Sequence, residues 1–332
     1  MKDWFKRRPK LSIFLAVVGG IILLLGILAL RPISLQQTFT PDPAASYEEA
    51  VSRIEAIRNE EAQIPGIEET CETQAQVHGE KRETVVVFLH GFTSCPDQFK
   101  DLGKEYFDLG YNVYIPRQPR HGLEDHTGDP LKGLSAEELA QFGTDAADIA
   151  QGLGDRVIVA GLSGGGTVAT WLAQERSDID LAVPISPFLG IGFIPKPLTR
   201  PLTNLILLVP DFHQWWDPVH GINNPLSASY SYRGYWTHAL FENIRLGFVT
   251  AADASEMKPM AGSILVVTND NDSSVNNAVT AGFVEAWQEH GEEFLDTYQF
   301  PKDFELPHDL ITFTRPDSQP EVVYPQLLEL IR

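Results

Sequence analysis

Cysteine, methionine and basic side chains are scarce in this sequence of 332 residues. There are two cysteines and three methionines, and 25 Lys and Arg face 45 Asp and Glu, which gives a net charge of −20 at pH 7. Such a charge repels nucleic acid and anionic lipid headgroups, so no nucleic-acid partner is expected. Internal repeats and low-complexity tracts are also missing, which argues against a repeat architecture.

Long hydrophobic runs are missing too, except for one near the start of the chain. Leu11 to Leu30 is a stretch of twenty uncharged residues, and at about 1.5 Å per residue a helix of this length crosses a hydrocarbon core of about 30 Å. Basic residues precede it and place the N-terminus in the cytoplasm: Lys2, Lys6, Arg7, Arg8 and Lys10. A cleaved signal peptide is the alternative, but the run exceeds the usual apolar region and lacks a clean Ala-x-Ala site.

The sequence therefore predicts a cytoplasmic tail and an uncleaved transmembrane signal anchor in residues 1–32. These residues hold six basic and one acidic side chain, so the remainder of the chain carries −25. Residues 33–83 are predicted to form a stalk or linker with a helical piece from Tyr47 to Ala62. The expected location is a single-pass membrane protein whose catalytic domain lies outside the cytoplasm.

The most informative motif is Gly161-Leu162-Ser163-Gly164-Gly165. A β-branched apolar run from Val157 to Ala160 precedes it, and a helix-like segment follows. A sharp turn between strand and helix exposes the serine Oγ, and glycines tolerate the cramped backbone. The helix start also aims free N–H groups at the place where an oxyanion would form. This context favours Ser163 as a nucleophile over an ordinary structural turn.

A serine nucleophile needs a histidine base and an orienting acid, which follow it in the order Ser, Asp, His in this strand-turn-helix context. The apolar run 263–268 predicts a buried strand, and the turn after it contains Asp270 and Asp272. Asp272 is favoured because it lies deeper in the turn, while Asp270 is the alternative. His308, in a loop after a short strand candidate, is the predicted base. Either aspartate could instead hydrogen-bond only its own turn.

An oxyanion hole requires a second N–H donor from the loop after an earlier central strand. The apolar run Thr84 to Leu89 predicts that strand, and His90-Gly91-Phe92-Thr93 is the loop. Phe92 N–H and Gly164 N–H are the predicted donors. His90 is expected to hold the shape of this loop through hydrogen bonds instead of transferring protons.

With these residues the chain resembles the α/β-hydrolase superfamily on its serine esterase and lipase side. The matching pieces are His90-Gly91-Phe92, the Ser163 motif, the Asp272 turn and Pro307-His308-Asp309. The segment from Gly110 to Gly122 resembles monoglyceride-lipase-like and carboxylesterase-like members. Those carry Pro-Gly-His-Gly, whereas Arg120 replaces the first glycine here. The resemblance covers residues 84–332 and implies an α/β-hydrolase fold that needs no metal or organic cofactor.

The order of apolar runs agrees with this fold. Strands are expected at 84–89, 111–115, 156–160, 180–185, 263–268 and 295–300, alternating with helices near 97–109, 135–151, 164–176, 277–290 and 320–331. Such alternation predicts a mainly parallel sheet with helices on both faces. Residues 187–259 are too long for one crossover helix and rich in aromatic side chains, so they are predicted to form a cap or lid lining an apolar pocket. The alternative is that these aromatics only pack the cap onto the core.

The two cysteines fall on either side of the first predicted core strand. Cys71 precedes it, and Cys95 follows the oxyanion loop. A Cys71–Cys95 disulfide is predicted because the expected compartment is oxidising, and the alternative is two free thiols.

The predicted function is a serine hydrolase that cleaves carboxylic esters, either short or medium acyl esters or monoacylglycerol-like lipids. Alternatives on the same scaffold are a serine peptidase and an acyltransferase. A catalytically inactive, membrane-tethered binding protein is the alternative from another class. A haloalkane dehalogenase is disfavoured because its nucleophile position would hold aspartate in place of Ser163. The expected partners are a small ester or lipid substrate and, through the N-terminal helix, a membrane.

Overall fold

A computed structural model describes residues 9–332. Its centre is a seven-stranded sheet in the order β1-β3-β2-β4-β5-β8-β9. All neighbours in this sheet run parallel except β1, which pairs antiparallel with β3 at one edge. The strands are β1 (Gln74–Gln76), β2 (Arg82–Leu89), β3 (Asn112–Ile115), β4 (Gly154–Leu162), β5 (Leu181–Ile185), β8 (Ser263–Asn269) and β9 (Leu295–Phe300).

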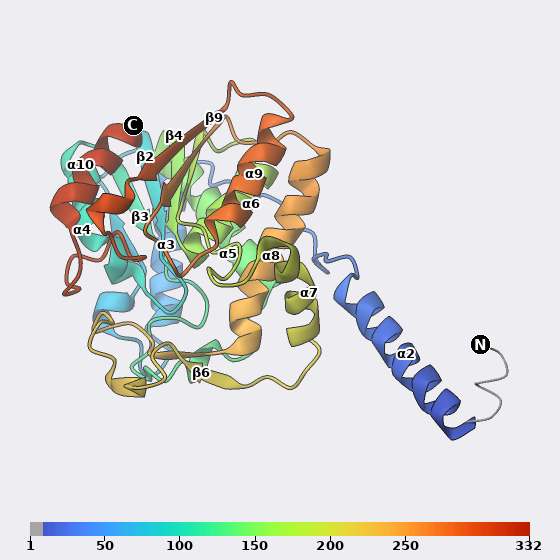
Figure 1. Cartoon of the computed structure of the whole chain (residues 1–332). Helices are drawn as coiled ribbons and strands as arrows, with labels where there is room; N and C mark the ends of the chain where they lie inside the picture. Colours follow the sequence, from blue (N-terminus) through green and yellow to red (C-terminus); the bar gives the residue numbers. More distant parts are fainter. Residues whose placement is uncertain (1–8) are drawn as a thin grey trace.

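The central strands are apolar on both faces because helices cover both faces. Val85 and Val87 of β2 join one buried cluster with α3, α5, α6, α8 and α9, whereas Val86 and Phe88 join another with α4 and α10 (Figure 1). These helices are α3 (Tyr47–Glu61), α4 (Lys100–Asp108), α5 (Ala136–Leu153), α6 (Gly164–Glu175), α8 (Thr237–Glu256), α9 (Asn277–Gln288) and α10 (Pro320–Leu330). The predicted α/β-hydrolase architecture is confirmed.

The segment 33–83, expected to be a stalk or linker, packs against the rest of the molecule. Ala50 and Ile54 of α3 are buried in the same cluster as α5. Contact between the two helices is close: a Cβ added at Gly152 of α5 would lie 2.7 Å from the Cβ of Ala50. Further along, β1 extends the sheet. This segment is therefore part of the fold and not a free tether.

The first described helix, α2 (Pro9–Ala29), extends away from the rest of the molecule (Figure 1). Among residues 9–332, no helix combines the length and the apolar character that crossing a membrane requires. Neither the signal anchor predicted for Leu11 to Leu30 nor membrane attachment through it is therefore supported. Lys2, Lys6, Arg7 and Arg8, which carried the prediction of orientation, lie outside the described residues.

The interval 187–259, expected to be a cap, contains two kinds of structure. Its first part holds α7 (Lys196–Ile206) and a two-stranded ribbon, in which β6 (His213–Trp215) pairs antiparallel with β7 (Gly234–Trp236). Its last part is α8, whose buried residues, including Ala239 and Ile244, belong to the cluster beneath α5 and α6. The aromatic first part lies near the carboxyl ends of the strands, while α8 helps to cover the sheet.

Candidate active site

Ser163 occupies a sharp turn between β4 and α6. Its backbone has φ of 55° and ψ of −113°, a strained conformation for a residue with a side chain. The Ser163 N–H donates to the carbonyl of Ile185 at 3.0 Å, which fixes the turn to the neighbouring strand β5. Close approach of strand and helix requires glycine here, since a Cβ at Gly165 would lie 2.0 Å from the carbonyl oxygen of Leu89. The predicted strand-turn-helix context is present.

The structure brings Ser163, His308 and Asp272 together in a hydrogen-bonded chain. His308 Nε2 lies 2.9 Å from Ser163 Oγ, and His308 Nδ1 lies 2.6 Å from Asp272 Oδ2. The His308 side chain is 24% exposed, whereas that of Asp272 is fully buried. A substrate can therefore reach the serine and the imidazole but not the carboxylate. This is the arrangement in which a serine hydroxyl can lose its proton to an oriented imidazole.

The carboxylate of Asp272 is held in its ionised form. Burial alone raises its pKa, but His308 and the backbone N–H groups of Ser274 and Val275 together outweigh this effect and leave the pKa below its ordinary value. Its second oxygen, Oδ1, accepts the backbone N–H groups of Ser274 and Val275 at 2.8 and 3.3 Å. Asp270, the alternative acid, makes no side-chain hydrogen bond to His308. Of the two aspartates, the geometry therefore favours Asp272.

The loop that carries His308 is anchored by side chains at the end of β8. Asn269 donates its amide to the carbonyls of Leu306 and Pro307, each at 3.0 Å. Asn271 donates to the carbonyl of Leu306 at 3.1 Å. The turn that supplies Asp272 thus also positions the residues directly before His308.

The two predicted oxyanion donors lie side by side. A Cβ added at Gly164 would lie 2.8 Å from the backbone nitrogen of Phe92, so the two backbones are in contact. Neither N–H donates a hydrogen bond to any residue in the described range 9–332. For Gly164 this follows from its place in the first turn of α6, where N–H groups have no partner within the helix.

His90 shapes the loop before Phe92, as predicted. It is fully buried, and its Nε2 accepts the Gln118 N–H at 3.0 Å while Nδ1 lies 3.0 Å from the carbonyl of Gly91. These partners define the neutral tautomer with the proton on Nδ1. Burial, with the nearby His121, lowers the pKa of His90 well below its ordinary value. The imidazole therefore remains uncharged and acts as a hydrogen-bonding brace.

Arg120, which replaces a glycine of the resembled family pattern, adopts the left-handed conformation that favours glycine. Its φ is 67°, and its guanidinium donates to Glu138 at 3.1 Å and to the carbonyl of Lys132 at 2.8 Å. The backbone shape of this loop is thus preserved, and two polar contacts accompany the unusual side chain.

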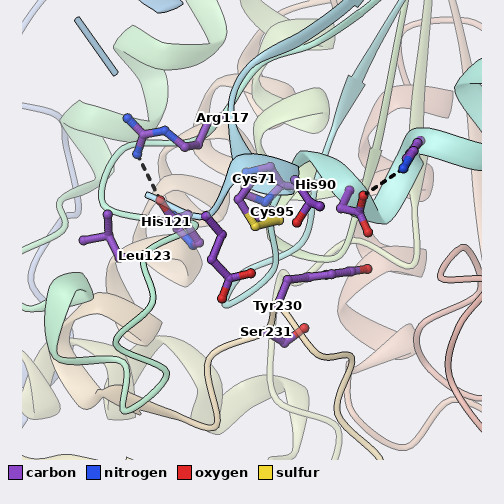
Figure 2. The surroundings of a disulfide bond; sticks show 12 residues. Cys71, His90, Cys95, Arg117, His121, Leu123, Tyr230 and Ser231 are labelled. Carbon is purple, nitrogen blue, oxygen red and sulfur yellow. Dashed lines mark hydrogen bonds and ion pairs between the residues drawn. A yellow bond between two sulfur atoms is a disulfide. The ribbon is translucent and has the colours of Figure 1, made fainter. Parts of the chain in front are cut away.

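Cys71 and Cys95 form a disulfide, as predicted, with their Cα atoms 5.2 Å apart. Figure 2 shows the bridge close to His90 and Tyr230, next to the loop that carries Arg117 and His121. Both cysteines are fully buried and pack with Ala228 and Tyr230. The bond therefore attaches the N-terminal segment to the chain that follows the oxyanion loop.

A cavity of about 590 Å³ opens beside Ser163 and His308. Most of its apolar wall comes from the interval expected to be a cap: Phe188, Ile191, Phe193, Trp216, Tyr235 and Leu240. Trp216 also donates its indole N–H to Thr93 Oγ1 at 3.0 Å, which connects this interval to the oxyanion loop. No set of three or more His, Cys, Asp or Glu side chains in the described part of the chain is placed to hold a metal ion.

A model of the alpha/beta hydrolase family matches residues 86–316. The chain belongs to this family. Over 120 residues it is 32% identical to a thermostable monoacylglycerol lipase of Bacillus sp. (strain H-257), and this match spans 34% of the chain and 44% of the length of that relative. The sequence similarity to this lipase thus extends over about a third of the chain.

Solved structures support the fold. A monoacylglycerol lipase of Paleococcus ferrophilus superposes with a TM-score of 0.58 at 16% identity, over 78% of this chain and 96% of that one. A soluble variant of monoglyceride lipase from Saccharomyces cerevisiae gives 0.57 at 12% identity, over 78% and 88%. Two metagenome-derived lipolytic enzymes, LipS and LipT, are the subject of a third match, with 0.56 at 19% identity over 80% and 99%.

Several polar residues around the site carry no signal in the sequence. Gln98, Gln118 and Asn269 act through contacts with residues distant along the chain, and each is a single amide in a segment without a motif. The link from Trp216 to Thr93 is equally long-range. Only the folded arrangement reveals these roles.

Proposed function

We propose that this protein is a serine hydrolase that cleaves carboxylic esters with Ser163 as nucleophile, His308 as base and acid, and Asp272 as the orienting group. The observation that carries the proposal is the continuous hydrogen-bonded chain from Ser163 Oγ through His308 to Asp272. Three side chains from three separate loops meet in this order, with the serine at the edge of a cavity.

In the first step His308 Nε2 takes the hydroxyl proton of Ser163 while Oγ attacks the ester carbonyl carbon. The carbonyl oxygen becomes an oxyanion, which the N–H groups of Phe92 and Gly164 stabilise. The ionised Asp272 keeps the imidazole in the required tautomer and stabilises its charged form. When the carbon–oxygen bond breaks, His308 gives its proton to the departing alcohol.

In the second step a water molecule replaces the alcohol. His308 takes a proton from the water as its oxygen attacks the acyl carbon attached to Ser163. Collapse of the second tetrahedral intermediate releases the carboxylic acid and returns a proton from His308 to Ser163 Oγ. Every proton moves through the same imidazole, so the reaction needs no further protein base.

The cavity supports an ester with an apolar acyl chain as substrate. Its wall contains the side chains of Phe188, Phe193 and Trp216, which suit a hydrocarbon chain of short or medium length. The monoacylglycerol lipase among the relatives makes monoacylglycerol-like lipids one part of the proposed range. We place the catalytic unit in an oxidising compartment outside the cytoplasm, and the Cys71–Cys95 disulfide supports this location.

Turnover of p-nitrophenyl esters from acetate to palmitate tests the proposal. Wild-type protein is expected to hydrolyse short or medium esters best, and Ser163→Ala is expected to lower kcat by several orders of magnitude. Equal turnover by both proteins would contradict the assignment of Ser163. A folded wild-type protein inactive on every ester would direct the search to peptide substrates instead.

A further inference from the structure

One buried amide connects the two halves of the proposed catalytic machinery. Gln98, on the short helical turn Pro96–Phe99, is 4% exposed. Its Oε1 accepts the N–H of Gly91 at 2.7 Å, and its Nε2 donates to Asp309 Oδ2 at 3.1 Å. Gly91 directly precedes the oxyanion donor Phe92, and Asp309 directly follows His308. A single side chain therefore spans the oxyanion loop and the histidine loop.

At the first end, the contact acts on the direction of the Phe92 N–H. The Gly91 carbonyl is held by the Ser94 N–H at 3.0 Å and by His90 Nδ1 at 3.0 Å. In a planar trans peptide the carbonyl and the following N–H point in opposite directions. Fixing the carbonyl of Gly91 therefore aims the Phe92 N–H, and the Gln98 bond to the N–H of Gly91 fixes the other side of the same residue.

At the second end, both carboxylate oxygens of Asp309 accept hydrogen bonds, most of them from its own loop. Its Oδ1 accepts the N–H groups of Ile311 and Thr312 at 3.2 and 3.1 Å. Its Oδ2 accepts the Thr312 hydroxyl at 2.6 Å in addition to the Gln98 amide. The hydroxyls of Thr312 and Tyr230 lie 3.1 Å apart, which extends the chain to the residue that packs on the disulfide. Asp309 thus shapes the loop of His308 without touching its imidazole.

We propose that Gln98 is a positioning residue that keeps the oxyanion donor Phe92 and the base His308 in register through its paired contacts to Gly91 and Asp309. The inference rests on the proposed function and adds to it a role outside the Ser163, His308 and Asp272 chain. Removal of one oxyanion donor costs about 10²- to 10³-fold in kcat, so a donor that is held out of position is expected to lose part of this effect.

The direction of the hydrogen bond between Gln98 and Asp309 provides the test. Gln98→Glu keeps an acceptor for the Gly91 N–H but places a carboxylate oxygen against Asp309. Asp309→Asn replaces one carboxylate oxygen with an NH2 group. This group then opposes either the NH2 group of Gln98 or the N–H groups of its own loop. In the double variant the bond is reversed, because the new amide at 309 donates to the new carboxylate at 98. Gln299→Glu, at an exposed position in β9, is the matched control for the added charge.

kcat and KM are measured on a p-nitrophenyl ester. The concentration of active sites in each preparation is determined by titration with a fluorophosphonate, and kcat is calculated per active site. Each single variant is expected to lower kcat about 10- to 100-fold with KM within about threefold. The double variant is expected to return to within about fivefold of wild type, and Gln299→Glu to match wild type. The affinity of an alkylboronic acid, whose serine adduct places an oxygen at the oxyanion position, is expected to follow kcat.

Single variants with wild-type kcat per titrated site would overturn the inference, as would a double variant as slow as the product of the two single effects. Wild type, the two single variants and the double variant are also compared by urea unfolding, so that coupling between Gln98 and Asp309 is measured without any substrate. Absence of coupling in both readouts would also overturn it. Failure of the proposed function is visible separately, as turnover that Ser163→Ala does not change.

Discussion

At the scale of single residues, the proposed active site contains both a strained backbone conformation and a buried charge. Ser163 has a positive φ that its side chain disfavours, and the surrounding strand and helix maintain it. Asp272 is buried with a negative charge, which is tolerated because His308 and two backbone N–H groups surround the carboxylate. The strained turn at Ser163 costs stability, whereas the partners of Asp272 offset the cost of burying its charge.

The lowered pKa of Asp272 predicts a pH-dependent contribution to stability. Its pKa in the folded protein lies below the value of about 3.9 expected for the unfolded chain. The stabilisation is therefore fully present above that value and is lost as the pH falls through the lower folded-state pKa. Urea unfolding should show a larger difference in unfolding free energy between wild type and Asp272→Asn at pH 6 than at pH 3. A difference that is the same at both pH values would contradict this account.

That the side chains of Ser163, Asp272 and His308 come together could be predicted because these residues lie in ordered motifs along the chain. Ser163, Asp272 and His308 each follow a predicted strand, and parallel strands bring their carboxyl ends to one edge of the sheet. Gln98 and Asn269 could not be predicted in the same way, because their function depends on partners 211 and 37 residues away. Local patterns carry no information about such pairs.

At the scale of elements, the N-terminal segment contributes to the fold through α3, β1 and the disulfide. The apolar runs predicted the six parallel strands, but β1, with the sequence Gln-Ala-Gln, has no apolar pattern. The burial of α3 against α5 depends on only two buried apolar side chains of α3, Ala50 and Ile54. Contacts of short elements of this kind are set by tertiary packing.

Truncating the buried face of α3 should destabilise the whole protein. Ile54 is 2% exposed, and Ile54→Ala is expected to lower the free energy of unfolding by about 2–4 kcal/mol through lost burial and a residual cavity. Glu55→Ala, at the exposed neighbouring position, is the control and is expected to change it by less than about 0.5 kcal/mol. An equally small effect of Ile54→Ala in urea unfolding would mean that α3 does not pack as described.

Loss of the disulfide should lower stability through the unfolded chain. The bond closes a loop between positions 24 residues apart, and loop-closure entropy gives a contribution of about 3–4 kcal/mol. The double variant Cys71→Ala, Cys95→Ala is expected to show this loss in urea unfolding, with the oxidised wild type as reference. Addition of a reductant should lower the stability of wild type toward that of the variant. Identical stability of all three samples would contradict a structural role for the bond.

At the scale of the whole molecule, the chain combines an acidic net charge with the alpha/beta hydrolase fold. The net charge of −20 is opposite in sign to that of typical polyanion-binding proteins. A cavity opens at the carboxyl edge of the seven-stranded sheet, beside Ser163 and His308. The apolar run at the start of the chain forms the helix α2, but the membrane span predicted for it is not supported.

The overall charge predicts how ester hydrolysis responds to the surface that presents the substrate. With a net charge of −20, the protein should hydrolyse a lipid ester more slowly in micelles with anionic detergent than in zwitterionic micelles. The difference should shrink as ionic strength rises from about 0.01 to 0.15 M, because the Debye length falls from about 30 to about 8 Å. Initial rates in the two micelle types across this range test the prediction, and rates independent of salt in both would contradict it.

The most direct test of the central claim, that Ser163 is the activated nucleophile, is covalent labelling with a fluorophosphonate followed by peptide mass spectrometry. One phosphonate per chain on Ser163 is expected, because its hydroxyl is hydrogen-bonded to His308 and through it to Asp272. His308→Ala should slow the labelling about 10³-fold or more, since it removes the base. No adduct on Ser163 in folded protein, or labelling that continues at the same rate without His308, would contradict the account.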